Sequence, residues 1–216
     1  MELLSLNIGV PRTFGDVDAF NPMLKEWTSG ILKEPVVGPV FLGRVNLVGD
    51  RQADHENHGG PDKAVNAYPG EHYSHWQATL GIESMPHGAF GENFTTSGLL
   101  EGNVCIGDVF QVGEALVQIS QPRQPCRKLA RRWQVKDLAA QVQETGRTGW
   151  YFRVLREGVV EAGMSFSRVE QAEAKWSVTE ANAVMFHRKD DLAAASSLAS
   201  HPALSESWRQ SLLQRV

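Results

Sequence analysis

Apolar and polar residues alternate over short stretches in the first two thirds of the chain, and the stretches are separated by Gly, Pro or Asp. Alternation with a period of two is typical of β-strands that have one buried face. The stretches are LLSLNIG, PVVGPVFLGRVNLVGD, KAVNAYP, VCIGDVFQVGEALVQISQP and WYFRVLREGVVEAGM. We expect the fourth to turn at Gly113-Glu114 and the fifth to form a hairpin at Glu157-Gly158. Many short strands broken by glycine favour a closed β-barrel over an open parallel sheet.

Helical patterns interrupt these strands. PGEHYSHWQATLG predicts a helix that ends at Gly81, and CRKLARRWQ and DLAAQVQETG predict two more, the last between Asp137 and Gly146. From about residue 177 the period becomes helical throughout, in SVTEANAVMFHR, LAAASSLAS and ALSESWRQSLLQ. Ser177 and Asp190 or Asp191 are the expected N-caps of the first two of these. The chain is therefore expected to be mainly β, with a β-barrel domain over residues 1–170 and a three-helix domain over residues 171–216.

Composition narrows the class of protein. Of 216 residues, 42% are hydrophobic and 21% charged, which is ordinary for a globular protein with a substantial core. The 21 basic and 25 acidic residues give no global basic footprint, so direct binding of polymeric nucleic acid is not expected. The N-terminus MELLSLNIGV lacks the basic region of a signal peptide, and no later segment has the ~18 apolar residues of a membrane span. We expect a cytoplasmic protein that does not associate with membranes.

Two cysteines limit the redox chemistry that the chain can perform alone. They are too few for a disulfide framework or for an all-cysteine iron–sulfur cluster, which needs four thiolates. The chain also lacks a G-x-G-x-x-G dinucleotide motif and a G-x-x-x-x-G-K-[ST] phosphate loop. A redox enzyme built from this sequence would need a separate source of electrons.

Cys126 stands in the unusual stretch SQPRQPCRKLARRW, where five Arg and Lys residues lie within six positions of it. Pro125 suits the start of a helix, so the thiol is expected near a helix N-terminus. Backbone N–H groups and guanidinium groups there would favour a thiolate, which is the form that acts as nucleophile or soft-metal ligand. The competing interpretation is a small buried hydrophobe beside a solvated basic face. Cys105, within an apolar strand, is expected to be plain core.

The stretch HENHGGPDKAV offers two kinds of chemistry. Gly59-Gly60 would let backbone N–H groups approach an anion, with Lys63 as a point charge for phosphate, although a simple β-turn on GGPD explains the same residues. The spacing of His55 and His58, repeated at residues 72 and 75, raises the alternative of a zinc site.

Taken in order, HGGPDKAV, YPGEHYSHW, FGENFTTSGL, GDVFQVGEALVQISQPRQPC and GRTGWYFRVLREGVVEAGM resemble the MOSC family, the domain related to molybdenum-cofactor sulfurases. The resemblance is to its YiiM-like bacterial branch and extends to the C-terminal helices. It implies a β-barrel that binds a pterin-based molybdenum cofactor, with Cys126 as the metal ligand and catalytic residue and Arg123 facing the anionic cofactor. The other cofactor-binding residues that it implies are Lys63, Asn93, Arg153, His58 and Thr95.

The resemblance also implies a reaction. YiiM-like proteins reduce N-hydroxylated compounds, including hydroxylaminopurine-type base analogues, to the amine and water. A separate reductase protein would then supply the electrons. Two alternatives stay open: a carrier of molybdenum cofactor or sulfur without reductase turnover, and a zinc hydrolase that uses the histidine pairs. The sequence leaves the oligomeric state open, a homodimer included.

Overall fold

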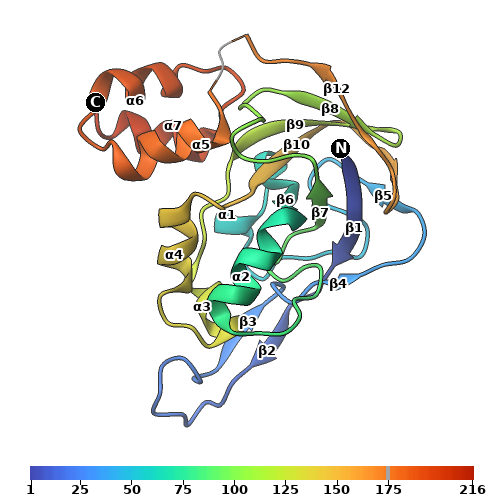
Figure 1. Cartoon of the computed structure of the whole chain (residues 1–216), viewed down its shortest axis with the longest axis vertical. Coiled ribbons are helices and arrows are strands. Elements are labelled where there is room, and N and C mark those ends of the chain that lie inside the picture. The colour runs from blue at the N-terminus through green and yellow to red at the C-terminus, as the bar shows by residue number, and fades with distance from the viewer. Residues whose placement is uncertain (174–175) are drawn as a thin grey trace.

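The computed structural model describes residues 1–173 and 176–216, and its main element is a curved eight-stranded sheet (Figure 1). In spatial order the strands are β12 (Phe166–Glu170), β8 (Val109–Val112), β9 (Ala115–Pro122), β10 (Trp150–Arg156), β6 (Val65–Pro69), β7 (Phe94–Ser97), β1 (Glu2–Ile8) and β4 (Glu34–Pro35). All neighbours are antiparallel except β6 and β7, which are parallel. Parallel neighbours need a crossover connection, and here α2 (Tyr73–Leu80) supplies it.

The sheet curls until its two ends meet. Glu2 and Ser165 form an isolated antiparallel bridge, and Leu3 N donates to Met164 O at 2.9 Å while Gly163 N donates to Leu3 O at 2.8 Å. The mainly β architecture is confirmed. The expected closure is only partial, because this seam is one bridge with its flanking hydrogen bonds and not a continuous ladder among the described strands.

The turn at Gly113-Glu114 is confirmed, since β8 and β9 form an antiparallel hairpin in which Val112 faces Ala115. The hairpin expected at Glu157-Gly158 is wrong. β11 (Gly158–Val160) pairs instead with β5 (Val40–Leu42), because β9 and β6 already occupy both edges of β10. The alternation missed a second small sheet, formed by β2 (Arg12–Phe14) and β3 (Trp27–Ser29).

The helices within the barrel domain form where their end signals predict them. α2 follows the 3₁₀ turn η2 (Gly70–His72) and ends at Gly81, whose φ of 65° is the left-handed conformation that glycine adopts readily. α3 (Arg127–Trp133) follows Cys126, and α4 (Leu138–Thr145) lies between Asp137 and Gly146. HENHGGPDK forms two short helices, α1 (His55–His58) and the 3₁₀ turn η1 (Pro61–Lys63), rather than one β-turn.

Helices also make up the C-terminal part of the chain. They are α5 (Val178–Asn182), the π-helix η3 (Ala183–His187), α6 (Leu192–Ala199) and α7 (Glu206–Leu213). The side chains of Ser177, Asp191 and Ser205 cap the first turns of α5, α6 and α7 by accepting backbone N–H groups. These helices (orange to red) lie against the sheet beside β9 and β10 (Figure 1). No helix of the described ranges is both long and apolar enough to cross a membrane.

Two apolar cores hold these elements together. The larger fills the barrel and continues into the C-terminal helices, so that Phe152 of β10 and Trp208 of α7 belong to one cluster. The smaller lies outside the sheet, where Trp76 of α2 and Leu129 of α3 pack around Phe90. Phe90 stands in the loop before β7, so this second core fixes a loop that faces Cys126.

Glu92 stabilises the same loop through hydrogen bonds to its carboxylate. Its carboxylate is fully buried and accepts hydrogen bonds from Gly88 N at 2.8 Å, Phe90 N at 2.9 Å and the hydroxyl of Tyr73. A buried carboxylate is tolerated only when such donors surround it. The loop conformation and the charge of Glu92 therefore depend on one another.

We expect Glu92→Ala to lower the free energy of unfolding by about 2–4 kcal/mol, because it leaves buried N–H groups without an acceptor. Urea unfolding followed by tryptophan fluorescence measures this. The matched control is Glu83→Ala, at an exposed position nine residues earlier, which should change stability by less than about 0.5 kcal/mol. Equal stabilities for the two variants would contradict the role assigned to Glu92.

Candidate functional site

Cys126 lies where the sheet passes into helix α3. β9 ends at Pro122, three residues lead to Cys126, and α3 begins at Arg127 with Cys126 as its extended N-cap residue (φ −113°, ψ 163°). The thiol is partly buried and borders two cavities that meet at this point. The sequence placed this cysteine at a helix N-terminus, and the structure confirms it.

The surroundings of Cys126 favour its ionised form. Burial alone would raise the pKa of the thiol, but a hydrogen bond with His58, the charge of Arg123 and the backbone N–H of Lys128 lower the pKa from 9.0 to about 7. Each of these groups stabilises a thiolate and not a thiol. The surroundings of Cys126 therefore favour the thiolate more than the surroundings of an ordinary cysteine do.

The smaller cavity has a volume of about 70 Å³ and a strongly cationic wall. One carboxylate, that of Asp54, also borders it. The cationic side chains that line it are those of Lys33, Arg51, Lys63, Arg123 and Lys128. Such a wall is suited to an anion, because charged donors bind phosphate and carboxylate oxygens more strongly than neutral donors do.

One guanidinium nitrogen of Arg123 is an unsatisfied hydrogen-bond donor in the part of the chain that the structure describes. Its side chain is buried, and Nη2 donates to the carbonyl of Phe90 at 2.9 Å. Nη1 is buried without a hydrogen-bond partner within residues 1–173 and 176–216. Because an unpaired buried donor is costly, this nitrogen beside Cys126 indicates that the cavity accepts a ligand with acceptor atoms.

The segment from Asp54 to Lys63, which contains Gly59 and Gly60, forms another part of the wall of the smaller cavity. Asp54 caps α1 by accepting the N–H of Asn57 at 3.0 Å, and Lys63 Nζ donates to Asn57 O at 2.8 Å. Burial lowers the pKa of Lys63, and Asp62 and Asp54 oppose that effect. Gly60 takes a φ of 91°, which a residue with a Cβ adopts only with strain. This local geometry brings His58 and Lys63 to the same side of the loop as Cys126.

Five of the seven residues that the resemblance implied border the smaller cavity: Cys126, Arg123, His58, Lys63 and Asn93. The amide of Asn93 is already used within the sheet, however, since it donates to Asn7 O at 3.2 Å and accepts Asn66 N at 3.2 Å. Thr95 is fully buried and outside both cavity walls as described, with its hydroxyl between Asn7 and Glu92. Both residues hold strands together behind the site.

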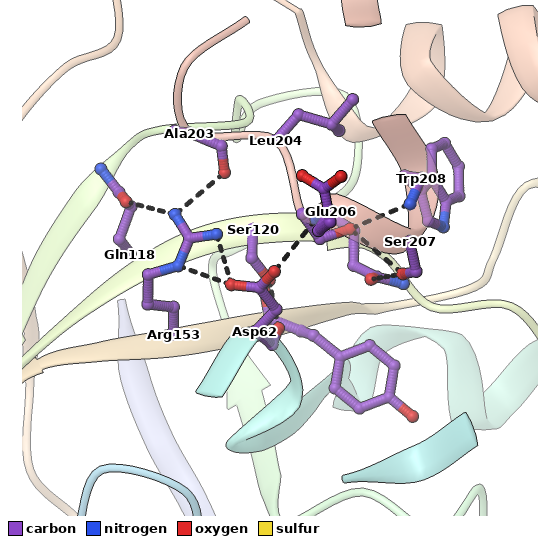
Figure 2. Close-up of polar contacts among 12 residues, drawn as sticks. Asp62, Gln118, Ser120, Arg153, Ala203, Leu204, Glu206, Ser207 and Trp208 are labelled. Carbon is purple, nitrogen blue, oxygen red and sulfur yellow. Dashed lines mark hydrogen bonds and ion pairs between the residues drawn. The ribbon is translucent and has the colours of Figure 1, made fainter. Parts of the chain in front are cut away.

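Arg153 lies outside both cavity walls as well, in the part of the chain that the structure describes. Figure 2 shows its guanidinium between Asp62, Gln118 and the carbonyl of Ala203, with distances of 2.5–3.1 Å. These contacts join the sheet, the loop before β6 and the C-terminal helices. The geometry therefore gives Arg153 a structural position, apart from the cationic wall to which sequence reasoning assigned it.

Sequence reasoning missed Lys33, Arg51 and Tyr151 of the cavity wall. Lys33 is buried against Asp50, and burial lowers its pKa while Asp50 raises it. Lys33 and Arg51 come from loops and Tyr151 from β10, and no spacing rule links these positions to the cysteine motif. The one available signal was a lysine next to an apolar run, in LKEPVVG.

The histidine pairs do not converge. His72 binds Glu101 through Nε2 at 2.8 Å, and His75 packs against Trp76 on α2, while His58 lies beside Cys126. Over the described residues, no three His, Cys, Asp or Glu side chains are grouped as metal ligands. Cys105 is partly buried rather than plain core, at the bridge to Ser177 where the C-terminal helices begin.

Comparison with known proteins identifies this architecture. A family model described as the MOSC domain matches residues 54–167, and one described as the YiiM-like, 3-alpha helix domain matches residues 176–216. The chain belongs to the MOSC family. The first range begins at the site loop and includes the strands from β6 to β11, while β1 to β5 precede it; the second range contains the C-terminal helices.

Two bacterial relatives match over most of their length. The chain is 48% identical to the uncharacterized protein YflK of Bacillus subtilis (99% of this chain, 93% of that protein) and 38% identical to protein YiiM of Escherichia coli (92% and 91%). A Gibberella moniliformis protein named reductase is 38% identical, over 77% of this chain but 30% of that longer protein. The crystal structure of YiiM from Geobacillus stearothermophilus superposes with a TM-score of 0.82 at 41% identity, covering 99% of this chain and 98% of that one.

The ionisation of Cys126 is directly measurable. The rate of alkylation by iodoacetamide should rise with pH and reach half its maximum near pH 7, since only the thiolate reacts. In His58→Gln the midpoint should move upward by about one pH unit, because the substitution removes the charge interaction by which His58 lowers the pKa of Cys126. Mass spectrometry assigns the label to Cys126 and separates it from Cys105. A wild-type midpoint near the ordinary cysteine value would contradict the proposed environment.

Proposed function

We propose that this chain is a molybdenum-cofactor-dependent oxidoreductase that reduces N-hydroxylated compounds to amines. The observation that carries the proposal is the juxtaposition of the ionisable Cys126 with the unpartnered Nη1 of Arg123 in a cationic cavity. Membership of the MOSC family supports the cofactor, and the reductase named among the relatives supports redox chemistry.

The residues present fit a pterin-based molybdenum cofactor. A soft metal binds a thiolate, which Cys126 offers at neutral pH. The cofactor's phosphate needs cationic donors, and Arg123, Lys63 and Arg51 line the same cavity as the thiol. Cys126 would hold the metal while these cations hold the anionic end.

The reaction takes two electrons and two protons. In R–NHOH + 2e⁻ + 2H⁺ → R–NH₂ + H₂O, the N–O bond breaks, nitrogen is reduced, and oxygen leaves as water. The bound cofactor would supply the two-electron redox chemistry. The side chain of His58 is hydrogen-bonded to Cys126, so it is placed to deliver one of the two protons. Tyr151, whose pKa burial raises and Arg123 partly lowers, stays protonated as a neutral donor in the cavity wall.

The electrons would come from a separate reductase protein. The sequence has neither a dinucleotide motif nor the cysteines for an all-cysteine cluster. The Gibberella protein named reductase is much longer than this chain, which matches 30% of it. A flavin- or cluster-containing partner protein would supply the electrons to this chain.

The test uses protein made in a host that synthesises the molybdenum cofactor. We expect Cys126→Ser to reduce turnover of hydroxylaminopurine at least 100-fold, with the same thermal unfolding midpoint as the wild type, since a hydroxyl is a poor soft-metal ligand. Molybdenum per chain is measured alongside by elemental analysis. Cys105→Ser is the matched control, and its turnover should stay within about twofold of the wild type.

Two outcomes would refute the proposal. Full turnover in Cys126→Ser would show that the thiol is not required. A wild-type protein that contains molybdenum but does not reduce the substrate, although the electron donor is active with another acceptor, would instead identify a cofactor carrier.

A further inference from the structure

An arm projects from the body of the molecule beside α3 (Figure 1, blue). It consists of residues 12–29, with β2 and β3 as its base and residues 15–26 as its tip. A connection of this length is uncommon in a compact domain and usually has a function. The arm lies outside residues 54–167 and 176–216, which the two family models match. The family chemistry therefore does not account for it.

The tip of the arm is ordered by its own hydrogen bonds. Asp16 N donates to Leu24 O at 2.9 Å, and Glu26 N donates to Asp16 O at 3.0 Å. The side chain of Asn21 accepts Met23 N at 3.0 Å. Internal bonds of this kind are typical of a compact surface loop. The tip is thus preformed, which lowers the entropy that ordering it would cost on binding.

This ordered tip exposes large apolar side chains. The relative exposures of Phe20, Val17 and Leu24 are 103%, 64% and 49%. Single exposed apolar residues are normal on a protein surface, but a group of them marks an interaction site. An exposed aromatic side chain is also the kind of residue that contributes most to binding at an interface.

The tip is acidic as well as apolar. Asp16, Asp18 and Glu26 are all exposed, and Lys25 is the one base among residues 15–26. The net charge of the tip is therefore negative. A surface that covers its apolar side chains needs cations around them, because acidic groups that lose water without a partner oppose binding.

Helix α3 holds the base of the arm. Arg131 Nε donates to Met23 O at 3.3 Å, and its guanidinium lies 5.1 Å from the centre of the Trp27 ring. Trp27 packs in turn against Phe14, with 5.1 Å between the ring centres. The same helix begins at Arg127, directly after Cys126. The arm and the cationic site at Cys126 are therefore neighbours along one helix.

The face around Cys126 carries the charge that the tip lacks. Arg51 and Arg127 are exposed and Lys128 is half-buried where they line the two cavities. Asp54 is the one carboxylate among the described residues that line these cavities. We call Arg51, Arg127 and Lys128 the cationic face. It complements the tip in charge, but on one chain the two surfaces lie beside each other.

We propose that two copies of this chain pair through the arm, with the tip of each copy docked on the cationic face of the other. Because tip and face flank the same helix, a two-fold axis brings both pairs together at once and closes the assembly as a dimer. Phe20 then lies in the apolar centre of each contact, and the charges pair around it. This pairing requires neither a cofactor nor the proposed reaction.

Sedimentation velocity over a concentration series of the cofactor-free chain tests the pairing. At about 50 µM the wild type should have twice the 23.9 kDa mass of one chain, and added salt should weaken the dimer. Phe20→Ser should raise the dissociation constant of the dimer at least about tenfold. Val37→Ser is the matched control, because Val37 is equally exposed at 104% but lies outside the arm, between β4 and β5. It should change the constant by less than about twofold.

A charge swap identifies the surface that the tip meets. Asp18→Lys with Glu26→Lys should weaken the dimer at least about tenfold, and so should Arg51→Glu with Arg127→Glu, because like charges then face each other. All four substitutions in one chain should restore the dissociation constant to within about threefold of the wild type. Each of the four positions is exposed, so the thermal unfolding midpoint should stay unchanged in every variant.

Three results would overturn this pairing. The first is a wild type that stays monomeric at about 50 µM. The second is a dimer that Phe20→Ser does not weaken, which would use another surface. The third is a folded fourfold variant that stays as weak as the double variants, since the tip would then meet some other face. Absence of turnover with N-hydroxylated compounds would bear on the proposed function and leave these masses unaffected.

Discussion

The stabilisation of one thiolate is the interaction on which the chemistry of this fold depends. Burial would keep Cys126 protonated, and His58, Arg123 and the first turn of α3 reverse that effect. Lowering its pKa from 9.0 to about 7 corresponds to roughly 3 kcal/mol in favour of the thiolate. This stabilisation depends on the positions of all three groups beside the thiol.

Two carboxylates, the buried Glu92 and the partly exposed Asp62, do much of this holding. Glu92 fixes the loop that carries Phe90, and the carbonyl of Phe90 in turn orients Arg123. On the other side of the cavity, Asp62 fixes the loop that carries Lys63. Glu92 acts on Arg123 through the Phe90 loop, and Asp62 acts on Lys63 through the loop that they share. Neither carboxylate lines the cavities at Cys126. The carboxylates of Glu92 and Asp62 thus position cations of the cavity without lining it themselves.

Local signals predicted much of the fold. The strand alternation, the helix ends at Gly81 and Gly146 and the caps at Ser177 and Asp191 concern residues close in the sequence, and the structure confirms them. The pairing of strands that are distant in the sequence could not be predicted from the sequence. β11 joins β5 because the edges of β10 are occupied, and that fact belongs to the whole sheet.

The same division holds for the site. Cys126 and Arg123 are three residues apart, and a motif contains both. Lys33 and Arg51 reach the cavity from other loops, which only tertiary contacts bring together. Arg153 illustrates the converse problem, since an arginine near an anion-site motif can be committed to a carboxylate, here Asp62. The residues around Arg153 in the sequence do not distinguish an arginine that binds a ligand from one that binds a carboxylate of the protein.

The contacts of Asp62 also set an order of events during synthesis. Its carboxylate bonds to Arg153, 91 residues later, and to the N–H of Glu206, 144 residues later. Because translation proceeds from the N-terminus, the glycine loop emerges from the ribosome long before its last anchor exists. The barrel strands can pair while α7 is still being made. The surroundings of the thiol are therefore complete only after α7 has been made.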